Sequence, residues 1–171
     1  SLEKINTKVK NKILKKYALL LNKERNSIIK ENVKDIKFAL TKGLKNNLID
    51  RLVINHKKLD NIKDSIYKII KLKDPVDNTL EKWSRPSGLR IKRVSIPIGV
   101  IGVIYESRPN VTSDVASLCF KSGNAVILKG GSEATNTNKI LAKLFRKALK
   151  ANNVNENFIQ FIDSKNRKMV D

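Results

Sequence analysis

The sequence has almost none of the residues that build disulfides and metal centres. Its 171 residues include one cysteine and one histidine. A single cysteine excludes an internal disulfide and a cysteine-based zinc cluster, and the lone histidine, His56, leaves little for a metal site of any kind. We therefore expect no metal, and we expect His56 to be a surface side chain without a functional role.

Long apolar runs are also missing. No stretch approaches the roughly 18 consecutive apolar residues that a membrane-spanning helix needs. Residues 1–16 are rich in lysine and lack the apolar core of a secretory signal. These features favour a soluble protein of the cytoplasm that does not act at a membrane.

Acidic and aromatic residues are scarce. The 36 lysines and arginines outnumber the 16 aspartates and glutamates, which gives a formal net charge of +20, and aromatic residues make up 5% of the chain. This charge would attract any polyanion. However, the lysines are spread along the whole chain, and few aromatics argue against a surface on which bases stack. A non-catalytic basic module that binds nucleic acid or another polyanion is therefore the less favoured alternative.

Residues 1–73 carry apolar residues at helical spacing. Three stripes, each about a third of a helix circumference wide, predict three helices that form a layer on a core. The stripes consist of Ile5, Val9, Ile13, Tyr17 and Leu21, then Ile29, Val33, Ile36, Leu40 and Leu44, then Leu48, Leu52, Leu59, Ile62, Ile66 and Ile69.

The helical pattern stops at residues 74–97. Pro75 and Pro86 exclude a regular helix over residues 74–88, so this part is expected to be a connector. Apolar and polar residues alternate over 89–96, which predicts a strand with one buried face. Pro97 ends or bends this strand.

The rest of the chain predicts a parallel sheet. Residues 98–104 are continuously apolar and β-branched, as in a strand buried on both faces. The pattern then predicts a helix over 113–121, a strand over 125–128, a helix over 133–150 and a strand over 157–162. This order is typical of a doubly wound, Rossmann-type parallel sheet. The predicted fold class is α/β, with an N-terminal helical layer.

Ligands of such sheets bind at the carboxyl ends of the strands. The loop over residues 105–112 follows the first strand of the sheet and places Arg108 and Asn110 at this edge. The alternative is an ordinary loop in which Asn110 or Thr112 caps the next helix.

The loop after the second strand is a further candidate. Gly130 and Gly131 would let the backbone approach a ligand, Lys129 can neutralise a phosphate, and Glu133 can accept hydrogen bonds from ribose hydroxyls. The alternative is a glycine turn with Ser132 as helix cap. Neither standard glycine-rich phosphate motif is present.

Cys119 is expected to be inert. Apolar residues flank it in a predicted helix, and no histidine is near it in the sequence to lower its pKa. A small buried hydrophobe is the favoured interpretation.

The string over residues 98–138 resembles a known signature. It includes YESRPNVT and SGNAVILKGGSEA, which are similar to the signature region of the γ-glutamyl phosphate reductase (glutamate-5-semialdehyde dehydrogenase) family, of the aldehyde dehydrogenase superfamily. The flanking segments LIDRL (48–52), DPV (74–76) and RPSGL (85–89) agree with it. The resemblance implies NADPH-dependent reduction of γ-glutamyl phosphate to glutamate 5-semialdehyde, with release of phosphate, in proline biosynthesis.

The resemblance also implies roles for individual residues. The amide of Asn110 would stabilise the oxyanion of the reacting acyl group. Lys129 to Glu133 would form the cofactor loop that holds the adenosine ribose, and Lys129 would suit the 2′-phosphate of NADPH. Arg108 would face the anionic substrate.

The catalytic cysteine of the family is not expected in this chain. Cys119 matches a helix cysteine of the family, whereas the nucleophile lies downstream in a separate catalytic domain. The resemblance therefore implies that these 171 residues alone are inactive, or that they serve as a helper or scaffold without chemistry of their own.

The same resemblance suggests how the chain is organised. It implies a helical layer over 1–73, a connector and extended β segment over 74–97, and a partial, aldehyde-dehydrogenase-like cofactor domain over 98–171. Residues 158–170 resemble the family's next strand and the loop after it. A homo-oligomer, formed through the segment near 89–96, and association with or fusion to glutamate kinase are the partners that it implies.

Overall fold

The computed structural model describes residues 5–163 and begins with helices. There are four before the first strand: α1 (Thr7–Lys23), α2 (Arg25–Thr41), α3 (Asn46–Leu52) and α4 (His56–Lys71). The prediction of a single third helix is therefore wrong, because its apolar stripe, residues 48–69, is divided between α3 and α4. Asn55 ends the continuity by capping α4, where its side chain accepts a hydrogen bond of 2.9 Å from the backbone N–H of Lys58.

Most of the first and third predicted apolar stripes is buried, although Leu48 is 40% exposed. Ile13, Tyr17 and Leu21 of α1 are fully buried, and so are Leu59 and Ile66 of α4. These helices pack against each other and against the helices that follow. His56, at the start of α4, is exposed as expected.

The stripe predicted for α2 is wrong. Val33 and Leu40 are exposed, whereas Asn32 and Asp35 are buried. Two polar side chains face inward because they bind backbone groups of other elements, described below. Hydrophobic periodicity cannot detect such a face.

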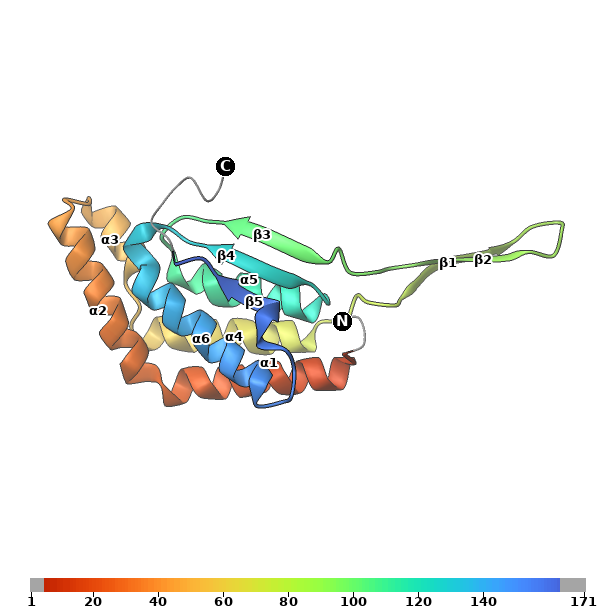
Figure 1. Cartoon of the computed structure of the whole chain (residues 1–171), viewed down its shortest axis with the longest axis horizontal. Coiled ribbons are helices and arrows are strands. Elements are labelled where there is room, and N and C mark those ends of the chain that lie inside the picture. Colours follow the sequence, from red (N-terminus) through yellow and green to blue (C-terminus); the bar gives the residue numbers. More distant parts are fainter. Residues whose placement is uncertain (1–4, 164–171) are drawn as a thin grey trace.

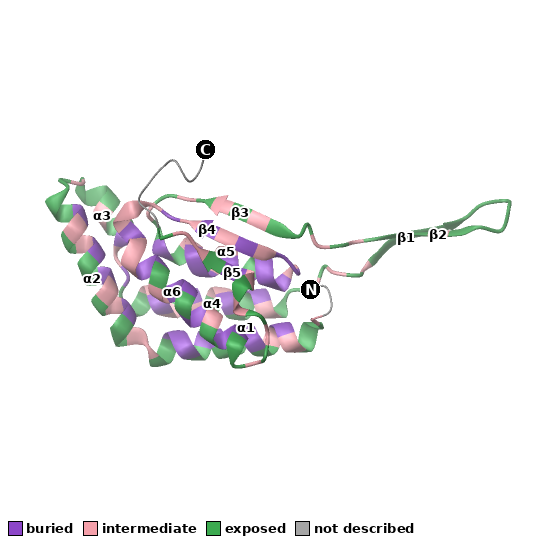
Figure 2. Ribbon diagram, viewed as in Figure 1, coloured by how far each residue is buried: buried purple, intermediate pink, exposed green. Residues whose placement is uncertain are grey.

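A β-hairpin projects from the helices (Figure 1). Its strands, β1 (Thr79–Ser84) and β2 (Arg90–Val94), pair antiparallel. Residues 74–88 contain no helix, as predicted, but they do contain a strand. The predicted buried face of residues 89–96 is wrong, since Leu89, Val94 and Ile96 are exposed and only Ile91 is partly buried. Figure 2 shows that most of the hairpin is exposed.

A parallel sheet follows the hairpin. Its strands are β3 (Val100–Ile104), β4 (Ala125–Lys129) and β5 (Ile159–Phe161), in the order β3-β4-β5. The helices α5 (Pro109–Lys121) and α6 (Thr135–Lys150) connect them. The predicted β-α-β-α-β alternation, the parallel sheet and the α/β fold class are confirmed.

Within residues 5–163, helices cover only one face of this sheet. Phe120 of α5 and Phe145 of α6 meet edge to face, with ring centroids 5.7 Å apart, so both helices lie on the same side. On the opposite face, the side chains of Val100 and Ile104 are 66% and 68% exposed. For these residues we therefore correct two expectations: the sheet is not doubly wound, and its first strand is not buried on both faces. Both follow from the strand order, because consecutive β-α-β units that step in one direction place their helices on the same face of the sheet.

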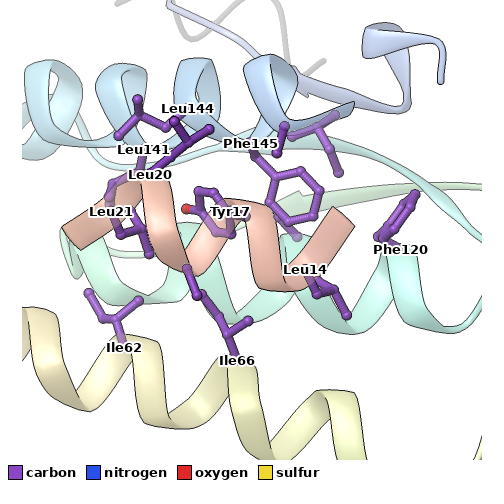
Figure 3. Close-up of a cluster of buried hydrophobic side chains, with 14 of the residues drawn as sticks. Leu14, Tyr17, Leu20, Leu21, Ile62, Ile66, Phe120, Leu141, Leu144 and Phe145 are labelled. Atoms are coloured by element: carbon purple, nitrogen blue, oxygen red, sulfur yellow. The ribbon is translucent and has the colours of Figure 1, made fainter. Parts of the chain in front are cut away.

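The helical layer and the sheet share one hydrophobic core. The ring of Tyr17 lies 4.5 Å from that of Phe145, centroid to centroid (Figure 3). The Tyr17 hydroxyl shares a hydrogen bond of 2.6 Å with Ser113 Oγ on α5. Ile62 and Ile66 of α4 belong to the same cluster. No described helix has both the length and the apolar character needed to cross a bilayer. Residues 164–170 of the predicted last loop lie outside the described residues.

Candidate functional site

The two predicted loops meet at the carboxyl ends of β3 and β4. The backbone N–H of Tyr105 donates to the carbonyl oxygen of Lys129 at 3.1 Å. Ser107 Oγ donates to Glu133 Oε2 at 2.6 Å, and Ser132 Oγ donates to Glu133 Oε1 at 2.8 Å. Both loops therefore present hydroxyl groups to one carboxylate.

Glu133 lines a cleft of about 400 Å³. The residues that line it are Leu44, Leu48, Arg51, Glu106, Ser107, Gly131 and Glu133. The first three come from α3 and the turn before it, and the rule that ligands bind at the sheet edge did not point to them. The segment LIDRL, which contains Arg51, carried a signal in the sequence, because it was one of the segments that supported the resemblance.

Gly130 and Gly131 are needed for the packing of the two loops. A Cβ on Gly131 would overlap Ser107 Oγ, and one on Gly130 would overlap the amide nitrogen of Asn138 and lie 3.1 Å from the Tyr105 ring. Of the two, Gly131 also lines the cleft. The close approach that requires these glycines is therefore one of protein to protein, as expected for a glycine turn. Ser132 as the helix cap is wrong, because Ala134 occupies the N-cap position of α6.

Lys129 does not line the cleft. Its ammonium group lies 3.4 Å from the carbonyl oxygen of Gly130, and its side chain is half-buried at the end of β4. Ser132 begins a short 3₁₀ turn, Ser132–Ala134, and α6 starts after it at Thr135.

Asn110 lies in the first turn of α5. Pro109 is the first residue of this helix, and Arg108 occupies the N-cap position without a side-chain cap. The alternative prediction, in which Asn110 or Thr112 caps α5, is therefore wrong. Thr112 is buried instead, where its hydroxyl donates to Asn138 Oδ1 at 2.8 Å.

The Asn110 side chain lines a second, polar cavity. Its volume is about 210 Å³, and the other lining residues are Lys58, Asn61, Ile62, Ser65 and Asp114. Asn110 Nδ2 donates to Asp114 Oδ2 at 3.3 Å, and Asp114 Oδ1 has no hydrogen-bond partner among residues 5–163. Burial raises the pKa of the Asp114 carboxyl, and the hydrogen bond from Asn110 offsets part of this effect.

Arg108 is half exposed beside Glu106. Its Nη2 lies 3.4 Å from Glu106 Oε2, and Nη1 of Arg51 lies 3.6 Å from the same oxygen. Arg108 lines neither of the two cavities. The structure thus brings Arg108 and Glu133 to the same edge of the sheet, while Asn110 opens into a separate space.

Cys119 is buried on α5 within the shared core. Burial raises the pKa of its thiol, which keeps the sulfur protonated and a poor nucleophile. This environment supports the interpretation of Cys119 as an inert side chain.

Asp35 of α2 holds the start of α6. Its carboxylate accepts hydrogen bonds from the backbone N–H groups of Asn136 and Thr137, at 3.1 and 2.7 Å, and from Thr137 Oγ1 at 2.6 Å. A carboxylate at a helix N-terminus satisfies unpaired N–H groups and interacts favourably with the helix dipole. An anionic ligand would have to displace Asp35 to use these two N–H groups.

The fold and the positions of these sites define a class. The crystal structure of an acetylating aldehyde dehydrogenase from Geobacillus thermoglucosidasius matches 97% of this chain and 34% of that chain, with a TM-score of 0.68 at 16% sequence identity. The chain therefore has an aldehyde-dehydrogenase-like α/β fold. No family model matches it.

Sequence similarity is much higher to one enzyme of this class. The chain is 44% identical to γ-glutamyl phosphate reductase of Thermotoga maritima over 164 residues, which are 96% of this chain and 40% of that protein. The crystal structure of the γ-glutamyl phosphate reductase from that organism covers 99% of this chain with a TM-score of 0.96, and 41% of that chain is matched. The resemblance expected from residues 98–138 is thereby confirmed along nearly the whole chain. The chain spans about 40% of the length of the curated relatives that it matches.

Proposed function

We propose that these residues form part of a reductase that converts γ-glutamyl phosphate into glutamate 5-semialdehyde with NADPH, in proline biosynthesis. The observation that carries this proposal is the 44% identity to a γ-glutamyl phosphate reductase over 96% of the chain. The match covers 40% of that relative, so the proposed activity is that of a longer enzyme. We do not propose Cys119 as its nucleophile, because the thiol lies in the shared core and burial raises its pKa.

The cleft beside Glu133 is the proposed cofactor site. The Glu133 carboxylate already accepts hydrogen bonds from two serine hydroxyls, and the free 3′-hydroxyl of the adenosine ribose of NADPH could donate to it in the same way. Lys129, Gly130, Gly131 and Ser132 complete this proposed loop. When bound, the nicotinamide would supply the hydride, and these residues would hold the adenosine end in place.

Asn110 is the proposed oxyanion donor. Its amide carries two N–H groups, of which one donates to Asp114. The second N–H remains for the developing negative charge on the reacting carbonyl oxygen. The other proposed substrate contact is Arg108, whose side chain is 48% exposed and carries the charge that an anionic substrate needs.

We also propose the setting of this enzyme. It would act in the cytoplasm, as a homo-oligomer assembled through the hairpin, and it would associate with the glutamate kinase that supplies the acyl phosphate. The exposed apolar side chains of the hairpin support the oligomer.

The test is an assay of a joined enzyme, in which this chain replaces the aligned 40% of the Thermotoga maritima reductase. We expect it to reduce NADP⁺ with glutamate 5-semialdehyde only when inorganic phosphate is present, because the acyl phosphate is the product in this direction. Formation of NADPH is followed by absorbance. A correctly folded joined enzyme that is inactive, or that oxidises the aldehyde equally well without phosphate, would contradict the proposal.

A further inference from the structure

We infer that Asp114, on α5, binds the α-ammonium group of γ-glutamyl phosphate and that Lys58, on α4, binds its α-carboxylate. This inference rests on the proposed function, and it names the residues that would recognise the amino-acid end of the proposed substrate. The site is the polar cavity of about 210 Å³ that Asn110 also lines, which is separate from the cleft beside Glu133.

This polar cavity lies between two helices that pack against each other. Its lining residues are Lys58, Asn61, Ile62 and Ser65 of α4 and Asn110 and Asp114 of α5. Within each helix they are three or four positions apart, so they share one face of that helix. Only Ile62 is apolar. The volume is below the roughly 300–1,000 Å³ of pockets for drug-sized ligands, so the cavity suits a group of amino-acid size.

Asp114 brings an unpaired oxygen to this cavity. Its Oδ2 accepts a hydrogen bond of 3.3 Å from Asn110 Nδ2, whereas its Oδ1 is buried without a hydrogen-bond partner among residues 5–163. Lys58 does not fill this position, because its ammonium group donates to the backbone carbonyl oxygen of Asp50 at 2.8 Å. A buried acceptor without a donor costs free energy, and a ligand ammonium would supply a charged donor to it.

The pKa of Asp114 agrees with such a ligand. Burial raises the pKa of this carboxyl, because the charged form is poorly solvated, and the hydrogen bond from Asn110 offsets part of the effect. A positive charge beside Oδ1 would favour the ionised carboxylate and lower the pKa again. Binding of an ammonium group would therefore relieve an electrostatic cost that the empty site carries.

The charges of the lining fit a zwitterion. Lys58 is the one cation and Asp114 the one anion among the six lining residues, so their formal charges cancel. They come from different helices, which leaves room for a ligand between them. Of the three N–H groups of the Lys58 ammonium, one donates to Asp50, and the others can donate to a carboxylate. An α-amino acid group carries both of the charges that this lining would pair.

The length of a glutamyl group fits the spacing of Asn110 and Asp114. Side chains four positions apart on a helix have Cβ atoms about 5–6 Å apart. The acyl carbon and the α-nitrogen of the substrate are separated by four bonds of about 1.5 Å each, hence by about 5 Å in an extended chain. A substrate whose carbonyl oxygen lies at Asn110, the proposed oxyanion donor, can therefore place its α-nitrogen beside Asp114.

The test is the substrate preference of the joined enzyme in the phosphate-dependent direction. The kcat/KM for glutamate 5-semialdehyde is compared with that for 5-oxopentanoate, the same aldehyde without the α-amino group. We expect the wild type to prefer glutamate 5-semialdehyde. Asp114→Asn should lower kcat/KM for this substrate roughly ten- to hundredfold, the effect of removing a hydrogen bond to a charged group, and should change that for 5-oxopentanoate little. The ratio compares two substrates on one protein, so a partial loss of folded enzyme cancels.

Lys58 is tested with the complementary analogue. Lys58→Gln should lower kcat/KM for glutamate 5-semialdehyde and should leave that for 4-aminobutanal, which lacks the α-carboxylate, nearly unchanged. Lys57→Gln and Asp64→Asn are the matched controls, because they change exposed charges of α4 that do not line the cavity. Both controls should keep the substrate preferences of the wild type.

A second measurement uses the 171-residue chain itself, which contains every residue that lines the cavity. The side-chain amide signals of Asn110 are followed by NMR during titration with L-glutamate or with glutarate, which lacks the ammonium group. We expect L-glutamate to shift these signals more than glutarate does, and Asp114→Asn to abolish the difference. Equal shifts with the two acids, or no shift with either, would overturn the inference, and this readout also holds if the joined enzyme does not fold.

The kinetic outcomes separate this inference from the proposed function. If the wild type uses 5-oxopentanoate as well as glutamate 5-semialdehyde, Asp114 does not bind the α-ammonium group, while the proposed reductase stands. The same holds if Asp114→Asn lowers kcat/KM equally for both substrates, because Asp114 then positions Asn110 or stabilises α5. If a folded joined enzyme has no phosphate-dependent activity, the proposed function is contradicted and the inference falls with it.

Discussion

Among single residues, Tyr105 contacts both candidate loops. Its hydroxyl shares a hydrogen bond of 2.6 Å with Thr112 Oγ1, and its ring lies close to Gly130. Burial raises the pKa of Tyr105 to about 12, and the hydrogen bond with Thr112 offsets part of this effect. The folded protein thus holds the phenol proton more tightly than the unfolded chain does.

This proton affinity makes the stability depend on pH. Because the folded pKa lies above the ordinary value of 10.0, the contribution is complete below about pH 10 and is lost as the pH rises toward 12. Tyr105→Phe should cost about 1 kcal/mol at pH 7, through the lost hydrogen bond. The difference between wild type and variant in the free energy of unfolding, measured in urea, should shrink above pH 10. A difference that stays constant or grows with pH would contradict this explanation.

Asn110 is the residue on which the proposed chemistry depends most. In the joined enzyme, Asn110→Ala should lower kcat by about 100- to 1,000-fold, because one donor to the oxyanion is lost. The KM for NADP⁺ should change little, since Asn110 opens into a different cavity from Glu133. Cys119→Ser is the control, and its activity should remain close to that of the wild type. Steady-state kinetics in the phosphate-dependent direction measure both variants. Equal losses in the two variants would point to damage of α5 in place of a catalytic role.

Among contacts between elements, that between α2 and α6 positions the two walls of the cleft. Asn32 Nδ2 donates to the carbonyl oxygen of Leu52 at 2.8 Å, and its Oδ1 accepts from the backbone N–H of Ile54 at 2.7 Å. Together with Asp35, it ties α2 to the link between α3 and α4 and to the start of α6. These contacts place the wall that carries Arg51 against the loop that carries Glu133.

Removal of the Asp35 carboxylate should destabilise this junction. Asp35→Ala should lower the free energy of unfolding by about 2–3 kcal/mol, because buried N–H groups at the start of α6 lose their acceptor. Asp35→Asn keeps one acceptor oxygen and should lose less. Asp64→Ala, which changes an exposed carboxylate of α4, should stay within about 0.5 kcal/mol of the wild type. Urea denaturation, followed by circular dichroism, measures the free energy of unfolding of the three variants. If Asp35→Ala lost as little stability as Asp64→Ala, the Asp35 carboxylate would not stabilise the contact between α2 and α6.

The hairpin is the most prominent feature at the scale of the whole molecule. An isolated pair of strands is marginally stable in water. Figure 2 shows that this hairpin is largely exposed, and its exposed side chains include Leu80, Trp83 and Leu89. Such a ribbon gains stability when another surface covers it, which supports the proposed homo-oligomer. No structural observation on residues 5–163 favours the alternative of a basic module that binds polyanions, although the net charge of +20 is compatible with it.

Trp83 can report on this association because it is the only tryptophan of the chain. As the protein concentration rises, its fluorescence emission should shift to the blue, since its side chain, 40% exposed in the monomer, becomes covered. The mass measured by light scattering should rise over the same range. Replacing residues 79–94 by a short Gly-Ser linker should leave a monomer. A monomer at every concentration, with constant emission in the wild type, would exclude assembly through the hairpin.

Local features of the structure were predictable. The apolar stripes of α1 and α4, the order β-α-β-α-β and the position of the candidate loops all depend on residues that are close in the sequence. The strings over residues 98–138 also indicated the family of relatives, because they are contiguous motifs. The roles of Arg108, Asn110 and Lys129 to Glu133, and the division of the chain near residues 73 and 97, stay predictions.

The sequence by itself thus determined the fold class, the order of strands and helices over residues 98–163 and the resemblance, because periodicity and contiguous motifs are local properties. Only the tertiary structure decided that α2 turns Asn32 and Asp35 inward, that one face of the sheet stays open within residues 5–163, and that Arg51 rather than Lys129 lines the cleft. Each of these depends on groups far apart in the chain, such as Asp35 with Thr137 or Arg51 with Glu106. Such pairs form only when packing of the shared core brings the elements together, so no local pattern reveals them.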